Sequence, residues 1–341
     1  AMEGFRDIPG FSVLVYYPRE GISPMQQAQM TRMPGDNVQA VGIAGNFDDA
    51  QAAVKAAFSR QKGLLPPGMA LTSANSINIG RLVPQMVYYI SACRELQQRY
   101  GVQPGQKIDF IVPTGNFGDI LAGYLVKRMG WPIGRLVCAS NENRVLTDFL
   151  HTGRYDRNRT LQVSLSPAMD ILVSSNLERL LYYAFDEDTS KVQALMAELA
   201  RDGHYQVTGP AFSHIQEHFL AASATDGDTL AAIRQVFDEC GYLMDPHTAT
   251  AWLAQETLGS SRNPRVVLAT ASPFKFPETV LAAIKKPVPT DPAQLLPRLA
   301  AATGQPIPRA LAGVLTRPVR HRDLVQKEDI LADINRRLAA W

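Results

Sequence analysis

The chain has 341 residues, of which 46% are hydrophobic and 19% charged, and its formal net charge at pH 7 is +2. This charge is too small to indicate a nucleic-acid partner, and the composition is typical of a soluble globular protein. Two domains are expected, because single hydrophobic cores usually stop growing near ~250–300 residues. No apolar run reaches the ~18 residues of a membrane span, so we expect a cytoplasmic protein without a membrane partner.

Three cysteines, Cys93, Cys138 and Cys240, lie far apart in the sequence. They form no C-x-x-C pair and have no His-linked spacing, so they are interpreted as reduced thiols and no metal site is predicted.

The first 60 residues alternate between strand and helix patterns. Strands are predicted at 11–18 and 37–44, and helices near 23–30 and at 48–58, with Asn46 or Asp48 as the cap of the second helix. The turn-rich sequence from Gly63 to Gly68 marks the passage to a second domain. A long helix follows over 79–99, with a kink expected at Pro84.

The sequence KIDFIVPTGNFGDILAGY, residues 107–124, predicts a buried strand, a tight loop and a helix. Gly115 and Gly118 would let the backbone approach a phosphate, and the helix start would present N–H groups to it. Many α/β proteins also have such turns without a ligand, so this loop alone leaves both interpretations open.

The second half of the chain continues the α/β pattern. A strand is predicted at 135–140 and a helix from Glu142 or Asn143. The polar segment 151–159 contains His151 and Arg154, and is interpreted either as a solvated loop or as a phosphate-binding segment.

Residues 186–240 are interpreted as an accessory helical insertion. His247 follows a helix-start Asp245 and is expected to hydrogen-bond locally, outside any catalytic set. The apolar run 266–270 predicts a strand that places Thr270 at its end, where α/β sheets bind ligands.

Seven segments, in this order, resemble the threonine synthase family. They are GNFDDAQAAVKAAF (45–58), SANSINIGRLVPQMVYYISA (73–92), VPTGNFGDILAGY (112–124), CASNENRVLTDFLHTGRYDRNR (138–159), SPAMDILVSSNLERLLY (166–182), YLMDPHTATA (242–251) and ATASPFKFPETV (269–280).

The resemblance implies a fold-type II pyridoxal-phosphate (PLP) enzyme, with a two-domain α/β fold like that of the tryptophan synthase β subunit and mostly parallel sheets. The substrate would be O-phosphohomoserine, converted with water to threonine and phosphate. The resemblance assigns the cofactor phosphate to Gly115, Asn116, Phe117, Gly118 and Asp119. It also assigns the pyridine nitrogen to Thr270, and places Asn75 and Asn78 along the active-site wall, although both asparagines also suit helix caps.

Domains are expected at 1–66, 67–286 and 287–341, the last a helical tail, in a monomer or homodimer. The family's Ser-Phe-Lys-Asp sequence, whose lysine forms the Schiff base with PLP, does not occur in these residues. Lys275 in PFKF resembles it only in lettering, so no catalytic residue is assigned.

We therefore expect a chain that has lost the N-terminal portion of the family sequence and is inactive by itself. The alternatives are another fold-type II PLP lyase, a non-catalytic threonine-synthase-like protein that binds PLP or a phosphorylated ligand, and a partial domain that binds nothing.

Overall fold

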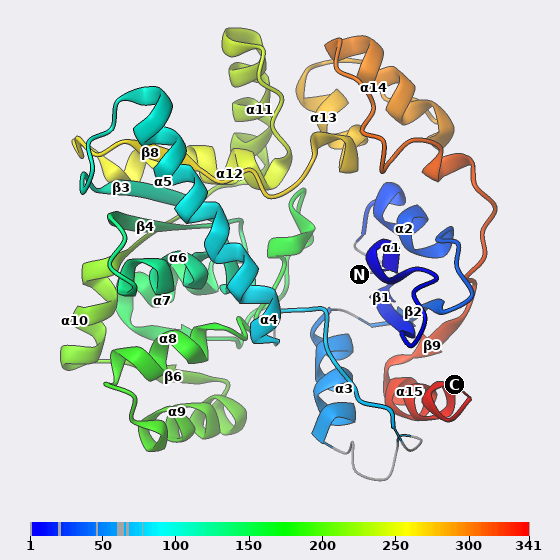
Figure 1. Cartoon of the computed structure of the whole chain (residues 1–341), viewed down its shortest axis with the longest axis horizontal. Coiled ribbons are helices and arrows are strands. Elements are labelled where there is room, and N and C mark those ends of the chain that lie inside the picture. The colour runs from blue at the N-terminus through cyan, green and yellow to red at the C-terminus, as the bar shows by residue number, and fades with distance from the viewer. Residues whose placement is uncertain are drawn as a thin grey trace. The chain divides into compact units, whose positions relative to one another are not determined.

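The computed structural model describes residues 2–19, 22–45, 47–59, 65, 68–76 and 78–340. It divides into two compact units, residues 1–74 with 274–341 (unit 1) and residues 75–273 (unit 2). Each unit contains a parallel sheet covered by helices (Figure 1). The proposed caps of the helix at 48–58, Asn46 and the Asp48 side chain, lie outside the described part.

The described part of unit 1 has a three-stranded parallel sheet in the order β1 (Val13–Pro18), β2 (Val38–Ala44) and β9 (Leu324–Gln326). Helix α2 (Pro24–Thr31) starts with a capping box in which Ser23 accepts from the N–H of Gln26, as its Ser-x-x-Gln sequence favours. Helix α3 (Phe47–Ser59) and helix α15 (Ile330–Ala339) pack together and bury Ala50, Ala57 and Ile334.

The C-terminal segment differs from the peripheral tail expected at 287–341, because its last elements are part of the unit 1 sheet and core. Asp333 on α15 is 4% exposed, and it accepts hydrogen bonds from Tyr16 of β1 at 2.7 Å and from Arg337 at 2.7 Å. Three-residue β9 pairs with β2 despite its weak strand pattern, since long-range pairing supplies the stabilisation that local propensity lacks.

Unit 2 has, within its described residues, a four-stranded parallel sheet in the order β7 (Phe219–Ser223), β4 (Ile133–Ser140), β3 (Ile108–Pro113) and β8 (Arg265–Val267). Both faces of β3 are buried. Phe110 and Val112 contribute to one apolar cluster and Ile111 to another, which explains why consecutive residues from Phe110 to Val112 are all apolar.

Helices on either side of this sheet bury its faces. The kink expected at Pro84 is confirmed, because α4 (Ile79–Leu82) and α5 (Met86–Tyr100) are joined by a 3-10 turn, η1 (Val83–Gln85). Helix α6 (Gly118–Arg128) follows β3, and α7 (Val145–Thr152) follows β4.

The segment expected as a helical insertion, 186–240, is partly integral to the unit 2 core. It contains α9 (Thr189–Asp202), β6 (His204–Gln206), α10 (Gly209–His218) and α11 (Asp226–Cys240), but also β7, which pairs with β4. The short apolar sequence FLAAS between two polar helices supplies this strand.

The remaining elements complete both units. They are α1 (Met2–Phe5), β5 (Arg154–Asp156), η2 (Pro167–Met169), α8 (Leu177–Ala184), α12 (Pro246–Ala254), η3 (Gln255–Leu258), η4 (Pro273–Lys275), α13 (Pro277–Ala283), η5 (Pro292–Gln294), α14 (Leu295–Thr303), η6 (Val314–Thr316) and η7 (Lys327–Asp329).

Candidate cofactor site

The glycine loop, residues 114–118, connects β3 to α6 at the carboxyl edge of the unit 2 sheet. Phe117 adopts the left-handed conformation with φ 60° and reverses the chain into the helix. Among the described residues, the N–H groups of Gly115, Asn116, Phe117 and Gly118 have no hydrogen-bond partner. Together with the positive end of α6, they form a set of donors that suits an anion.

Close packing leaves no room for a side chain at Gly115 and little room at Gly118. A Cβ atom on Gly115 would lie 2.4 Å from the carbonyl oxygen of Ala168, a backbone atom that cannot rotate away. A Cβ on Gly118 would lie 3.2 Å from Cβ of Ser76, which is tight but less severe. The loop backbone is therefore held closely on both sides, and a larger residue at position 115 would displace it.

Asp119 directs its carboxylate toward Tyr89. The Tyr89 hydroxyl, on a fully buried side chain, lies 3.1 Å from Oδ1 of Asp119 and 2.9 Å from its carbonyl oxygen. Burial raises the pKa of Asp119 to about 6, and the hydrogen bond from Tyr89 partly opposes this shift. The loop's carboxylate thus has a partner inside the protein.

Residues 166–176, here called the bracing segment, contact the carbonyl side of the glycine loop. Ser174 donates its hydroxyl to the carbonyl of Gly115 at 2.9 Å. The side-chain amide of Asn176 donates to the carbonyl of Asn116 at 2.8 Å, and its backbone N–H does so at 3.2 Å. Because the carbonyls are turned toward the bracing segment, the loop's N–H groups remain available on its other side.

A buried polar network holds the bracing segment. Asp170 is 7% exposed and accepts hydrogen bonds from Asn141 at 2.7 Å, Asn143 at 3.0 Å and the Ser164 hydroxyl at 2.7 Å. Burial raises the pKa of Asp170, and the bonds from Ser164 and Asn141 oppose the shift. Asn141 and Asn143 are engaged in this way, so α7 begins only at Val145, later than the sequence pattern predicted.

Sequence reasoning did not identify this network. A signal was present, since Asn141 and Asn143 lie within three residues of the end of the buried strand β4, but the acceptor they share, Asp170, lies 27 or more residues away. Sequence spacing alone does not reveal such contacts.

Thr270 follows β8 at the same carboxyl edge of the sheet from which the glycine loop extends. β3 and β8 are adjacent and parallel, with Ile111 paired to Val267, so both chains continue from their carboxyl ends side by side. The strand ends at Val267, three residues earlier than predicted, and Thr270 is exposed.

Asn75 and Asn78 lie in the segment that contacts the loop through Ser76. Asn78 caps α4, accepting the N–H of Gly80 at 2.9 Å, so its capping role is confirmed. The carbonyl of Asn75 accepts the N–H of Asn78 at 3.2 Å. A contact of either side chain with a ligand stays a prediction.

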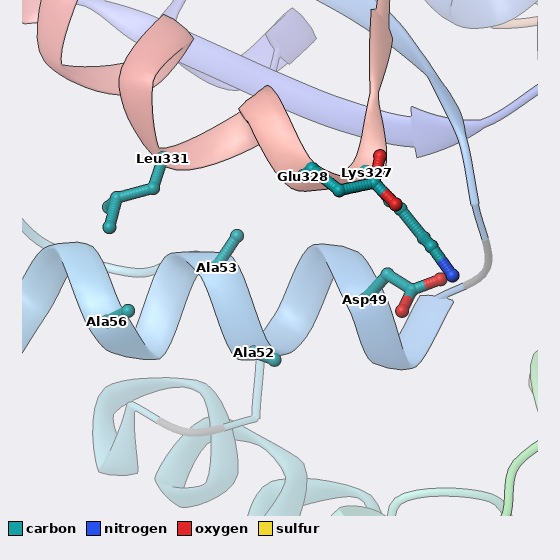
Figure 2. A pocket seen from close by; sticks show the side chains of 7 residues that line it. All are labelled: Asp49, Ala52, Ala53, Ala56, Lys327, Glu328 and Leu331. Carbon is teal, nitrogen blue, oxygen red and sulfur yellow. The ribbon is translucent and has the colours of Figure 1, made fainter.

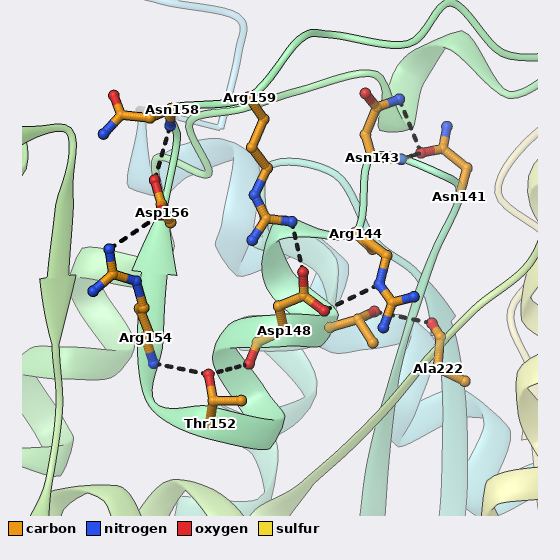
Figure 3. Close-up of polar contacts among 11 residues, drawn as sticks. Asn141, Asn143, Arg144, Asp148, Thr152, Arg154, Asp156, Asn158, Arg159 and Ala222 are labelled. Carbon is orange, nitrogen blue, oxygen red and sulfur yellow. Dashed lines mark hydrogen bonds and ion pairs between the residues drawn. The ribbon is translucent and has the colours of Figure 1, made fainter.

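Arg154 and Arg159 of the polar segment 151–159 form ion pairs with nearby carboxylates (Figure 3). Arg144 and Arg159 both pair with Asp148, at 3.0 and 2.6 Å, and Arg154 pairs with Asp156 at 3.2 Å. These pairs favour the solvated-loop interpretation over a phosphate-binding role.

A separate groove of about 370 Å³ lies in unit 1, between α3 and the start of α15 (Figure 2). Lys327 points toward Asp49 across it, beside three alanines of α3. It is lined by Asp49, Ala52, Ala53, Ala56, Lys327, Glu328 and Leu331, which include none of the expected site residues.

The described residues contain no group of three or more His, Cys, Asp or Glu side chains placed to hold a metal ion. Their helices are all too short or too polar to cross a bilayer.

Known proteins resemble this chain over most of its length. Residues 8–270 match the family of pyridoxal-phosphate-dependent enzymes, and residues 248–334 match the C-terminal region of threonine synthase. Threonine synthase-like 1 of Macaca fascicularis is 40% identical over 279 residues, which cover 80% of this chain and 38% of that protein. Threonine synthase of Pseudomonas aeruginosa is 40% identical over 296 residues, covering 86% of this chain and 61% of that enzyme.

The fold matches a solved enzyme of the same kind. The crystal structure of PLP-bound threonine synthase from Brucella melitensis superposes with a TM-score of 0.81 and 36% identity, covering 100% of this chain and 67% of that one. The expected α/β fold with mostly parallel sheets is thus confirmed, as is PLP as the cofactor of the family. This chain belongs to the threonine synthase family of pyridoxal-phosphate-dependent enzymes.

Proposed function

We propose that this chain carries the cofactor site of a threonine synthase, an enzyme that converts O-phosphohomoserine and water to L-threonine and phosphate. The observation that carries the proposal is the glycine loop. Its four N–H groups are unpartnered within the described residues and lie at the start of α6, and the carbonyls of Gly115 and Asn116 are held by the bracing segment. This arrangement suits the phosphate of PLP in both charge and shape.

The residues of the glycine loop fit the phosphate group of PLP. Gly115 and Gly118 leave the backbone uncovered, and their Cβ atoms would have collided with Ala168 and approached Ser76. Asp119 does not oppose a phosphate as strongly as its sequence position implies, because its carboxylate lies against Tyr89 and its pKa is raised to about 6. In a family member the substrate's own phosphate leaves from its γ carbon, and water adds at the β carbon.

Thr270 is our candidate partner for the cofactor's pyridine nitrogen. When bound, PLP supplies an electron sink for the carbon atoms of the substrate. A neutral threonine hydroxyl can donate or accept a hydrogen bond there, but it would not hold the nitrogen protonated as a carboxylate would. Asn75 and Asn78 remain candidates for contacts along the wall of the site.

No lysine of these 341 residues is proposed to bind the cofactor covalently. Lys275 belongs to η4, and its carbonyl accepts the hydroxyl of Ser23 at 3.2 Å, which gives the segment a structural role. Borohydride reduction of the chain with PLP should therefore leave Lys275 without a stoichiometric pyridoxyl group in the peptide map. A single stoichiometric label on Lys275 would overturn this assignment.

Binding is tested with the 341-residue chain and PLP, followed by absorbance and fluorescence titration with inorganic phosphate as competitor. Gly118→Asp places a carboxylate at the start of α6 and should weaken PLP binding at least about tenfold. Gly227→Asp is the matched control, because Gly227 is exposed in the first turn of α11. Equal PLP affinity in Gly118→Asp and Gly227→Asp would refute the assignment of the loop.

Catalysis is tested in a chimera that joins the N-terminal part of the Pseudomonas aeruginosa enzyme to this chain. The two sequences share 40% identity over 86% of this chain. Threonine formed from O-phosphohomoserine, and lost in Gly118→Asp, would support the proposed activity. PLP binding without threonine would instead favour a non-catalytic protein, an alternative raised by the equal 40% identity to threonine synthase-like 1.

A further inference from the structure

The bracing segment contacts the glycine loop through Ala168, and Ala168 is itself held by a residue that belongs neither to the bracing segment nor to the loop. Ala168 presents its carbonyl oxygen to Gly115, 2.4 Å from where a Cβ atom would lie. The same residue donates its backbone N–H to Nε2 of His247 at 3.3 Å. Ala168 is itself exposed, so this hydrogen bond and the flanking turn hold it in place.

His247 is buried, with 4% exposure, in the first turn of α12. Its Nδ1 lies 2.8 Å from Oδ1 of Asp245, which is 1% exposed and also accepts from the N–H of His247 and the hydroxyl of Thr248. A carboxylate accepts and a backbone N–H donates, so the ring proton lies on Nδ1 and Nε2 accepts from Ala168. Asp245 therefore fixes the tautomer that Ala168 requires.

We propose that Asp245 and His247 are positioning residues for the cofactor-phosphate loop. Asp245 holds the imidazole, the imidazole holds Ala168, and Ala168 limits where Gly115 can lie. This inference rests on the proposed assignment of the glycine loop to the phosphate of PLP. Ser174 and Asn176 hold the loop carbonyls from the same segment, so a shift at Ala168 is passed to the N–H groups that face the ligand.

Two substitutions of His247 separate the contact of its ring with Asp245 from that with Ala168. An asparagine reaches Asp245 as Nδ1 does, but it is too short to accept from Ala168. A glutamine reaches the position of Nε2 and can accept that N–H. Thr250→Val is the matched control, because Thr250 is buried on the same helix and its hydroxyl bonds only within α12, to Pro246 at 3.0 Å.

The first measurement is amide hydrogen exchange of the chain without PLP. Two backbone N–H groups report directly on how firmly the bracing segment is held: that of Ala168, which donates to His247, and that of Asn176, which donates to Asn116. Both should exchange faster in His247→Asn than in the unmodified chain, and near the unmodified rate in His247→Gln and Thr250→Val. Unchanged exchange in His247→Asn would overturn the proposal.

The second measurement is titration with PLP. His247→Asn should weaken binding about three- to tenfold, which is the value of one lost hydrogen bond, and His247→Gln should restore most of it. Equal affinity in His247→Asn and Thr250→Val, or equal loss in His247→Asn and His247→Gln, would contradict the positioning role. If the unmodified chain binds no PLP, the cofactor assignment fails, whereas the link from His247 to the loop is still judged by the exchange rates.

Discussion

Gly115→Ala is the substitution whose effect can be derived most directly from the structure. The added methyl group would lie 2.4 Å from the carbonyl oxygen of Ala168, whereas ordinary contacts begin at 3.4 Å. About 1 Å of separation must therefore come from movement of the loop or of the bracing segment, and neither is a flexible side-chain end. Insertion of a methyl group into such a packed site costs about 1–3 kcal/mol of unfolding free energy.

The position of the N–H groups should change together with the stability. A loop moved by about 1 Å no longer directs its four N–H groups to one point, so PLP affinity should fall about tenfold. Gly118→Ala should be milder, because its Cβ would lie 3.2 Å from Cβ of Ser76, so a movement of a few tenths of an ångström relieves the contact.

Chemical denaturation followed by circular dichroism gives the stability, and PLP titration gives the affinity. Gly227→Ala is the control for the substitution itself, since Gly227 is exposed on α11 and alanine is the better helix former by up to ~1 kcal/mol. If Gly115→Ala is as stable as Gly227→Ala and binds PLP with unchanged affinity, the close packing inferred at Ala168 is wrong.

Three further predictions concern charged groups. Burial raises the pKa of Asp119 from 3.8 to about 6, so between these pH values the native state keeps a proton that the unfolded chain releases. The free energy of unfolding should therefore fall by at most about 3 kcal/mol as the pH rises from 4 to 8. Asp119→Asn keeps an acceptor for Tyr89 and should gain stability over the unmodified chain at pH 8 but not at pH 5, a result that denaturation at both pH values checks. Asp333→Asn leaves Arg337 without its buried carboxylate and should destabilise unit 1 by about 2–4 kcal/mol, seen as faster proteolysis of its strands. Arg154→Gln removes an exposed ion pair, and both stability and phosphate binding should stay within error, with a change in stability below about 1 kcal/mol.

The local sequence pattern was sufficient to predict the strand and helix that flank the glycine loop. The run from Phe110 to Val112 is apolar on both faces because helices cover both sides of the sheet, and a proline and glycines follow it. Ser23 and Pro84 acted as cap and kink, as their chemistry predicts. In each of these cases the cause lies within a few residues of the effect.

The elements that the sequence did not predict depend on distant partners. β9 has three residues with exposed ends, and it becomes a strand by pairing with β2, more than 280 residues earlier. β7 lies between two polar helices and is a strand because β4 accepts it at the sheet edge. Such pairing depends on tertiary contacts that no short window of sequence contains.

The electrostatic role of Asp119 likewise depends on a distant residue and could not be predicted from the local sequence. Two carboxylates at the start of α3, those of Asp48 and Asp49, argue from sequence against phosphate binding there, yet Asp119 occupies the equivalent position in the proposed phosphate loop. Whether a carboxylate repels a nearby phosphate depends on the orientation of its side chain and on whether it is protonated. Tyr89, thirty residues earlier, donates a hydrogen bond to the Asp119 carboxylate, and burial raises the pKa of Asp119 to about 6. A charge in a sequence therefore opposes an anion only where the fold leaves that charge facing the site.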